Sequence, residues 1–521
     1  MSYISNIGGK LTITAKGSIK IYAKENIEIT SAKSVCFTGV ENGVSFGKPE
    51  DGPPTPDMIL DAKCIVQFRP RNSWKGKFGF DWFRIGDTNL QGDENYDNLI
   101  GQYYDKSPSD ITSDKNRNSN SWTTFFQVDP QPTRHSGLDK LKKLKALYGE
   151  YSYSLENDAS GTPVNKKYYK PVIALFPRIV DPADSKKTLE SGEAELKILL
   201  EFQKVNGNIV KPDKVVFEMD NTLMDASHPL VTIDKHTILK KDLNNKEDIK
   251  ITCLADFASD KEIKVWAITL DETGKQKTKL FAGILKMIAP SKRITKEVVI
   301  VRILNSAGTG SRKNLDLFER NLKQALISVN ITEKALDKSG AMKDVLLDLR
   351  TATKNHLNIN FDTEFNVKDG NIVSEEWYPP NNLRLQEYLK IELELKYPGQ
   401  FTNHFKLFFL YNMCDLVEVK DASGNTLQSQ STLGFSSLNT DFGVMFKNHD
   451  TITIGHECMH GLGLQHSFYG NNYLYKALKT DNIMDYSHNE INKVTGATST
   501  VLERVSTWYW QWDILNTNII D

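Results

Sequence analysis

Cysteine is scarce in this sequence, with five residues among 521. They are widely scattered: Cys36, Cys64, Cys253, Cys414 and Cys458. An odd number of cysteines at such spacing excludes a disulfide framework and indicates synthesis in a reducing cytoplasm.

The sequence also lacks a run of about 18 apolar residues, which excludes a transmembrane helix. Its first ten residues have neither the basic region nor the apolar stretch of a secretory signal peptide, so export by that route is not expected. Neither sign of charge dominates, because 65 basic residues face 66 acidic ones. This balance argues against a nucleic-acid or anionic-membrane partner.

The most informative stretch that is present runs from Gly455 to His466 and reads Gly-His-Glu-Cys-Met-His-Gly-Leu-Gly-Leu-Gln-His. On a helix His456 and His460 leave the same face one turn apart, so both can bind one metal ion. Gly463 can adopt the left-handed conformation that ends a helix and turns the chain back, which makes His466 a third ligand. Three histidines leave one zinc coordination position open, as in catalytic sites, and Glu457 lies close enough to contact a water there. The alternative is that these are ordinary helix and loop residues.

This pattern resembles the signature of the metzincin metallopeptidases, H-E-x-x-H-x-x-G-x-x-H followed by a methionine turn. The turn has its counterpart in Asn-Ile-Met-Asp-Tyr at 482–486. The resemblance implies a Zn²⁺ cofactor, Glu457 as general base and Met484 packed beneath the imidazoles. It also implies that Tyr486 contacts the metal or the oxyanion, as in the astacin-like and serralysin-like branches. The substrate would be a protein or peptide.

The first 50 residues contain a repeat of eight. Paired apolar residues recur at this spacing: Leu11 and Ile13, Ile19 and Ile21, Ile27 and Ile29, Val35 and Phe37. Residues 8–40 resemble the triple-stranded β-helix of phage needles and type VI secretion spikes, which implies a homotrimer or a spike-protein partner. A β-meander packed on the following domain is the alternative reading.

These patterns predict a multidomain chain with an N-terminal β-helical needle, β-sandwich middle domains and a C-terminal α+β zincin domain. The expected boundaries are 1–47 for the needle, 48–60 for a linker, 61–186 for a β-rich domain, 187–289 for an immunoglobulin-like sandwich and 290–521 for the metzincin-like peptidase.

Within the last domain, Val298–Leu304 reads as a buried parallel strand and Leu383–Lys396 as a helix. A second helix is expected to carry a stripe of apolar residues from Leu315 to Val329, and a third to include Val345–Leu349. The resemblance to the metzincins implies an edge strand for an extended substrate, with Thr432–Ser436 as the candidate, beside a strand at Gly443–Phe446.

Two helix boundaries follow from capping residues. Asp450 or Thr451 is expected to cap the zinc helix, and Thr500 with Glu503 to form a capping box that begins a closing helix.

The predicted function is zinc-dependent endopeptidase activity, made in the cytoplasm and exported by a contractile secretion apparatus as a toxin or effector into a target cell or the exterior. Two alternatives remain at this point. One is a structural spike or adaptor with a vestigial or self-processing peptidase domain, and the other is a protease that lacks a needle.

Overall fold

The structure is a computed structural model of the chain. It describes residues 58–60, 63–100, 137–158, 160–337, 339–350, 360–365, 367, 371–372, 384–420, 426–467, 473, 475, 479–485 and 502–517. The chain divides into two units, Met1–Ile59 and Leu60–Asp521. The octad repeat and the linker up to residue 57 therefore lie outside the described residues, and the linker's last three residues form strand β1 (Met58–Leu60).

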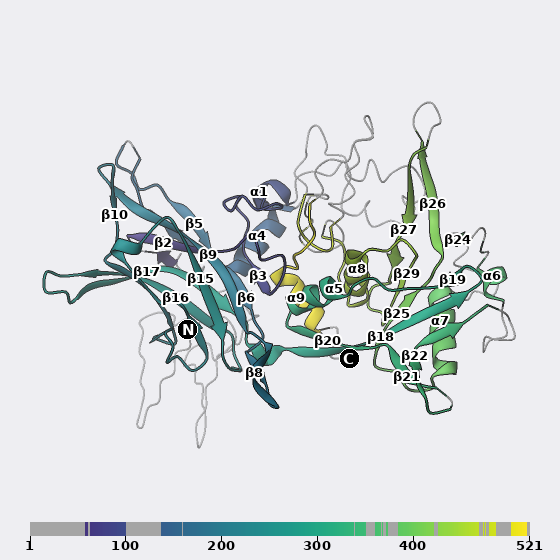
Figure 1. The fold of residues 1–521 in the computed structure, drawn as a ribbon. Coiled ribbons are helices and arrows are strands. Elements are labelled where there is room, and N and C mark those ends of the chain that lie inside the picture. Colours follow the sequence, from purple (N-terminus) through teal and green to yellow (C-terminus); the bar gives the residue numbers. More distant parts are fainter. Residues whose placement is uncertain are drawn as a thin grey trace, which may run out of the picture. The chain divides into compact units, whose positions relative to one another are not determined.

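Strands between Cys64 and Met287 form two sheets that share one hydrophobic core. The first sheet is antiparallel and has the order β10 (Asn208–Val210), β9 (Glu193–Val205), β15 (Lys246–Cys253), β13 (Val231–Ile233), with β2 (Cys64–Pro70) also paired to β9. The second has the order β12 (Thr222–Leu223), β11 (Lys214–Met219), β16 (Lys261–Leu270), β17 (Gln276–Met287), β6 (Val172–Ala174), β3 (Gly79–Asp81), with β14 (Thr237–Leu239) paired to β11. We call the described residues between 63 and 287, which include these two sheets, the two-sheet region (Figure 1).

The pairing of β2 with β9 places residues from both predicted middle domains in the same sheet. Alternate side chains of β9 point into the core, as the alternating pattern of its sequence predicts. The boundary expected at 186 and 187 therefore does not separate two cores, because apolar alternation marks a strand without specifying its partner. Further elements here are α1 (Tyr96–Leu99), α4 (Gly137–Tyr148), β4 (Glu150–Tyr153), β5 (Lys166–Tyr169), β7 (Ile179–Asp181) and β8 (Asp184–Glu190).

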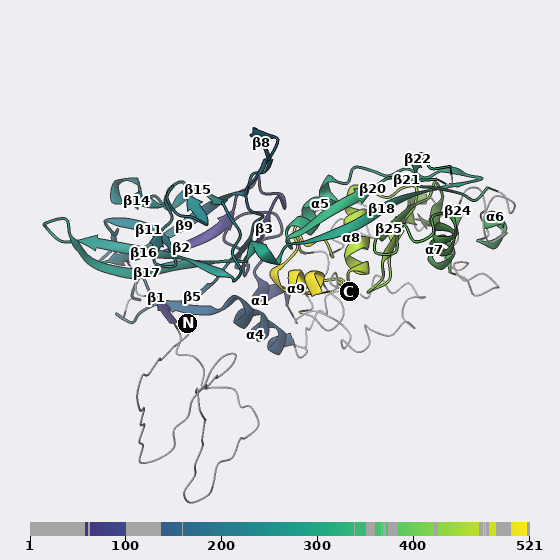
Figure 2. The ribbon, with the colours of Figure 1, turned by 90° about the horizontal axis from the view of Figure 1, so that it is seen from below.

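A mixed sheet follows, built around the long strand β18 (Ile294–Asn305). Its strands run in the order β19 (Gly308–Thr309), β18, β25 (Phe405–Phe409), β29 (Phe442–Met445), β28 (Gly434–Phe435). Two more strands, β20 (Ile327–Thr332) and β23 (Leu346–Asp348), run parallel to β18. The last strand, β28, is antiparallel to β29, whereas β25 is parallel to both of its neighbours. Figure 2 shows β18 and β20 side by side.

Both faces of the mixed sheet are buried. Val298 and Ile300 belong to a core shared with α5 (Asp316–Lys323), α8 (Thr451–Gly461) and α9 (Tyr509–Thr517). Val299 and Val301 belong to a second core, shared with α7 (Leu385–Lys396). Burial on both faces explains the continuous apolar run of β18, and the predicted buried parallel strand at Val298–Leu304 is confirmed. Smaller elements are β21 (Lys334–Leu336), β22 (Met342–Asp344), α6 (Phe361–Glu364), β24 (Asn371–Ile372), β26 (Met413–Lys420) and β27 (Thr426–Thr432).

Three predicted helices differ from the structure. Residues 346–348 form strand β23, because a short apolar run fits a buried parallel strand as well as a helix. Helix α5 ends at Lys323, and Leu326 then takes a positive φ of 59° that leads into β20. The closing helix begins at Tyr509, so Glu503 does not belong to its start, and residues 502–508 form neither helix nor strand apart from one isolated β-bridge between Ser506 and Asn482.

None of the helices in the described part of the chain combines the length and apolar character needed to cross a bilayer.

Candidate metal centre

Helix α8 carries two of the predicted ligands, and its start is fixed by Asp450. The backbone N–H and the hydroxyl of Thr453 both donate to the Asp450 carboxylate at 2.7 Å, which confirms the predicted cap. One turn further on, Gly455 lets α5 approach closely, since a Cβ there would lie 3.1 Å from the Asn321 side chain. The helix is thus held in place at its start and along its length.

The helix ends as the glycine pattern predicts. Gly463 has a φ of 92°, a conformation that disfavours other residues, and its N–H donates to the carbonyl of His460. The next N–H, of Leu464, donates back to Met459 at 2.9 Å. This reversal returns His466 toward the two helical histidines.

The Nε2 atoms of the three histidines converge. The distances are 3.1 Å from His460 to His456, 3.1 Å from His460 to His466 and 3.3 Å from His456 to His466. Three nitrogens bound tetrahedrally to one zinc ion at about 2.05 Å would lie about 3.3 Å apart. The three side chains therefore fit a zinc ion without rearrangement, and they form a metal-binding group within the described residues.

Backbone carbonyls orient two of the rings. His456 Nδ1 lies 2.8 Å from the carbonyl oxygen of Ile483, and His460 Nδ1 lies 2.7 Å from that of Leu464. Each Nδ1 can only donate to a carbonyl, so each Nε2 carries the lone pair that a metal needs. The lone pairs of His456 and His460 then face each other at 3.1 Å and repel unless a cation lies between them.

Burial keeps these imidazoles neutral. It lowers the pKa of His460 to about 4. Burial, followed by the neighbouring histidines, also lowers the pKa of His456 well below its ordinary value. Neutral imidazole is the form that binds metal. Because the low pKa values disfavour protonation, protons compete only weakly with a metal ion for these nitrogens.

The predicted methionine turn lies directly against this cluster. Met484 is fully buried in the core that also contains Met459 and Leu464. Its N–H donates to the side chain of Asn482 at 2.9 Å, and its carbonyl accepts from the N–H of Ser467, next to His466. The turn is thus tied to the third ligand's loop as well as to His456. Tyr486 lies outside the described residues, as does the neighbouring loop at 468–472.

Glu457 follows the first histidine and is 8 % exposed. Burial raises the pKa of its carboxyl to about 8, although the backbone N–H of Ser436 and the charge of Arg504 act in the opposite direction. Glu457 does not belong to the group of side chains that converge as possible metal ligands. A carboxyl with a pKa near neutrality beside an open metal position is suited to take up and release a proton.

The strand that supplies Ser436 is the predicted edge. Strand β28 pairs antiparallel with β29, with Gly434 opposite Met445 and Phe435 opposite Val444, as expected from the sequence. It lies against α8, because a Cβ on Gly434 would come within 3.0 Å of Thr453 and 3.1 Å of the Glu457 side chain. The last strand of the sheet therefore passes directly beside the candidate base.

This close approach gives a prediction for Gly434→Ala. The added methyl group displaces the Glu457 side chain by a few tenths of an ångström, and we expect kcat on a peptide substrate to fall about tenfold with zinc content unchanged. Steady-state kinetics and metal analysis measure both. Gly443→Ala on β29 is the matched control, because its Cβ would come 3.2 Å from the flexible ends of Leu407 and Met445 and 3.7 Å from the Phe405 ring, none of which belongs to α8. Equal loss in both variants would contradict the special role of position 434.

Sequence reasoning missed Arg504. The guanidinium is 3 % exposed and donates to the carbonyl oxygen of Asp485 at 2.9 Å. Its positive charge lowers the pKa of both Glu457 and His456. The sequence predicts that this segment begins the closing helix, and no signal in the sequence marks Arg504 as buried.

Comparisons with known proteins add little. No family model matches the chain, and no curated protein matches it either. Among solved structures, a match is found to WR4, a C. elegans MSP family member, at 15% identity. It covers 19% of this chain and 84% of that one, with a TM-score of 0.12.

Proposed function

We propose that this protein is a zinc-dependent endopeptidase of the metzincin type. The observation that carries the proposal is the convergence of the three Nε2 atoms at 3.1–3.3 Å, with Glu457 on the same helix and the edge strand β28 beside it. A structural zinc site has four protein ligands, whereas three histidines leave a position open for chemistry.

The residues then have distinct roles. His456, His460 and His466 would hold a zinc ion, which would supply Lewis-acid chemistry and activate a water at neutral pH. The Glu457 carboxylate accepts the proton of the attacking water and delivers it to the leaving amine nitrogen. The Ser436 N–H holds this carboxylate in place, and Arg504 favours its ionised form.

An extended peptide chain is the substrate that this surface suits. Strand β28 is the last of its sheet and runs antiparallel to β29. A peptide that adds to it through backbone hydrogen bonds would pass over Glu457, which is within van der Waals reach of Gly434. Backbone recognition of this kind favours a protein substrate.

The same proposal includes delivery on a secretion spike as a toxin or effector, which is supported by the octad repeat at residues 8–40. A needle of this type winds three chains around one axis, so we expect the full-length protein to be a trimer in solution. Light scattering measures this directly. A monomeric full-length chain would favour a β-meander and a protease without a needle.

The decisive experiment for the function compares new protein N-termini in a target-cell lysate after exposure to the wild type and to Glu457→Ala. The wild type alone should generate a defined set of new N-termini, and these also report the cleavage preference. Identical sets from both proteins would favour the alternative, a structural spike or adaptor whose peptidase domain is vestigial. New termini within the chain itself and nowhere else would indicate self-processing.

A further inference from the structure

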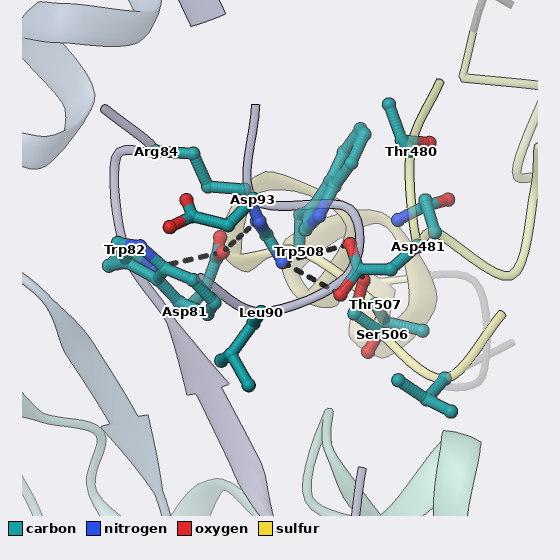
Figure 3. A network of polar contacts seen from close by, with 12 residues as sticks. Asp81, Trp82, Arg84, Leu90, Asp93, Thr480, Asp481, Ser506, Thr507 and Trp508 are labelled. Atoms are coloured by element: carbon teal, nitrogen blue, oxygen red, sulfur yellow. Dashed lines mark hydrogen bonds and ion pairs between the residues drawn. The ribbon is translucent and has the colours of Figure 1, made fainter. Parts of the chain in front are cut away.

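An arginine from the two-sheet region is buried against the methionine turn. Arg84 is 1 % exposed, and its Nη2 donates to both carboxylate oxygens of Asp481 at 3.0 and 3.2 Å (Figure 3). Its Nη1 donates to the Tyr96 hydroxyl at 2.6 Å and lies 3.4 Å from Asp81. The guanidinium also stacks over the ring of Trp82, 4.1 Å from its centroid. These contacts fix the side chain in one orientation.

The other side of this network is anchored in the two-sheet region and in the last helix. Asp81, at the end of β3, is fully buried and accepts from the N–H of Trp82 at 3.0 Å. It also accepts from the Tyr148 hydroxyl and, at 2.7 Å, from the N–H of Tyr509. Burial opposes the charge of Arg84, but Asp481, Tyr96 and Asp81 hold its pKa well above the ordinary value. The arginine therefore remains a cation.

Asp481 transmits this anchoring to the metal site. Its backbone carbonyl accepts from the N–H groups of Val505 and Ser506, and its carboxylate accepts from the Ser506 hydroxyl. The Ser506 carbonyl accepts from the N–H of Ile483 at 2.8 Å, and the Ile483 carbonyl in turn orients His456. The path from the guanidinium to His456 thus runs through the Asp481 side chain, the backbone from Asp481 to Ile483 and the Ile483 carbonyl, with hydrogen bonding at both ends.

The backbone of the two-sheet region contacts the same residues independently of Arg84. Gly92, with a φ of 82°, lies so close that a Cβ would be 2.8 Å from the Asp481 side chain and 2.9 Å from its nitrogen. Gly92 therefore packs against the start of the turn, and Arg84 fixes the direction of the carboxylate.

Stability alone does not explain this pair. A buried ion pair often contributes no more than well-packed apolar side chains would, so a pair whose guanidinium is directed by Asp481 and Tyr96 suggests a role in geometry. We propose that Arg84 is a positioning residue of the metal centre, which holds Asp481 so that the Ile483 carbonyl keeps His456 aligned. This inference rests on the proposed zinc centre, but not on the identity of the substrate.

The test measures zinc affinity in the full-length protein by competition with a chromogenic chelator. Arg84→Met is expected to weaken zinc binding about tenfold or more, in the range found when outer partners of a ligand are lost. The absorption spectrum of the cobalt-substituted protein should change as the His456 ring turns. Arg84→Lys, which keeps the charge and loses the two-pronged contact, should recover part of the affinity.

Arg69→Met is the matched control. Arg69 is 3 % exposed in the same region and pairs with Asp87 at 2.6 Å. It should lower the melting temperature without a change in zinc affinity or cobalt spectrum. Should Arg84→Met not fold, Asp481→Asn, which keeps the shape of the side chain, is expected to weaken zinc binding in the same way.

A double variant separates action through Asp481 from general destabilisation. If Arg84 acts through Asp481, Arg84→Met with Asp481→Asn should bind zinc no more weakly than Arg84→Met alone. Wild-type zinc affinity and cobalt spectrum in Arg84→Met and Asp481→Asn would overturn the inference. An inactive wild type that binds zinc tightly would instead overturn the peptidase proposal and leave the affinity comparison valid.

Discussion

Glu457→Gln is expected to lower kcat on a peptide substrate by about 10²- to 10⁴-fold, the contribution of a positioned general base. The amide has nearly the same shape but cannot take up the proton, so the attacking water stays unactivated. Zinc content should remain one equivalent, because the metal-binding group among the described residues consists of His456, His460 and His466 and does not include Glu457. A fluorescence assay with a quenched peptide substrate measures kcat, and metal analysis of the same preparation measures its zinc content.

Glu392→Gln provides the control for this experiment. Glu392 is 1 % exposed on α7, which packs against the opposite face of the mixed sheet. The control therefore removes a buried carboxylate of similar exposure at a distance from the histidines. Activity within a fewfold of wild type is expected. Unchanged peptidase activity in Glu457→Gln would refute the assignment of the base and with it the proposed mechanism.

Removal of the third ligand should have an equally large effect on the metal. His466→Ala leaves two imidazoles, and we expect zinc affinity to fall by more than about 100-fold, beyond the loss typical of an outer partner. After dialysis the zinc content should drop from one equivalent to nearly none, and peptide cleavage should be lost with it. The third ligand separates the extended signature from a chance pair of histidines.

His449→Ala serves as the comparison. His449 is 2 % exposed near the start of α8, and its Nδ1 lies 2.6 Å from the Phe446 carbonyl oxygen. It lies outside the group of converging nitrogens, so its loss should leave zinc content unchanged. Full zinc retention in His466→Ala would show that His466 is no ligand and would contradict the catalytic type of site.

The three candidate ligands could be predicted because the spacing of residues along a helix determines which side chains lie on the same face. Two histidines four apart on a helix, and a glycine that permits the reversal after it, determine three positions without knowledge of the fold. The edge strand at Gly434 was predicted from the resemblance to the metzincins, which implies such a strand just before the helix.

What the sequence could not supply is the partner of each segment. Val345–Leu349 became a strand because β18 offers it a parallel neighbour, and its own residues are compatible with either structure. The segment with Arg504 is not helical, and the Asp481 carbonyl accepts the N–H groups of Val505 and Ser506. Arg84 is informative only together with Asp481, and the separation of 397 positions leaves no periodic signal.

The pairing of the last segment with the methionine turn has a consequence for biosynthesis. Asp81 accepts a hydrogen bond from a residue 428 positions later, and Asn482 exchanges amide hydrogen bonds with Gln511. A nascent chain on the ribosome can therefore not complete the turn that orients His456 until these late residues have emerged. Premature termination would release a product with all three histidines but without the support for their arrangement, which would limit proteolysis by incomplete copies in the cell that makes them.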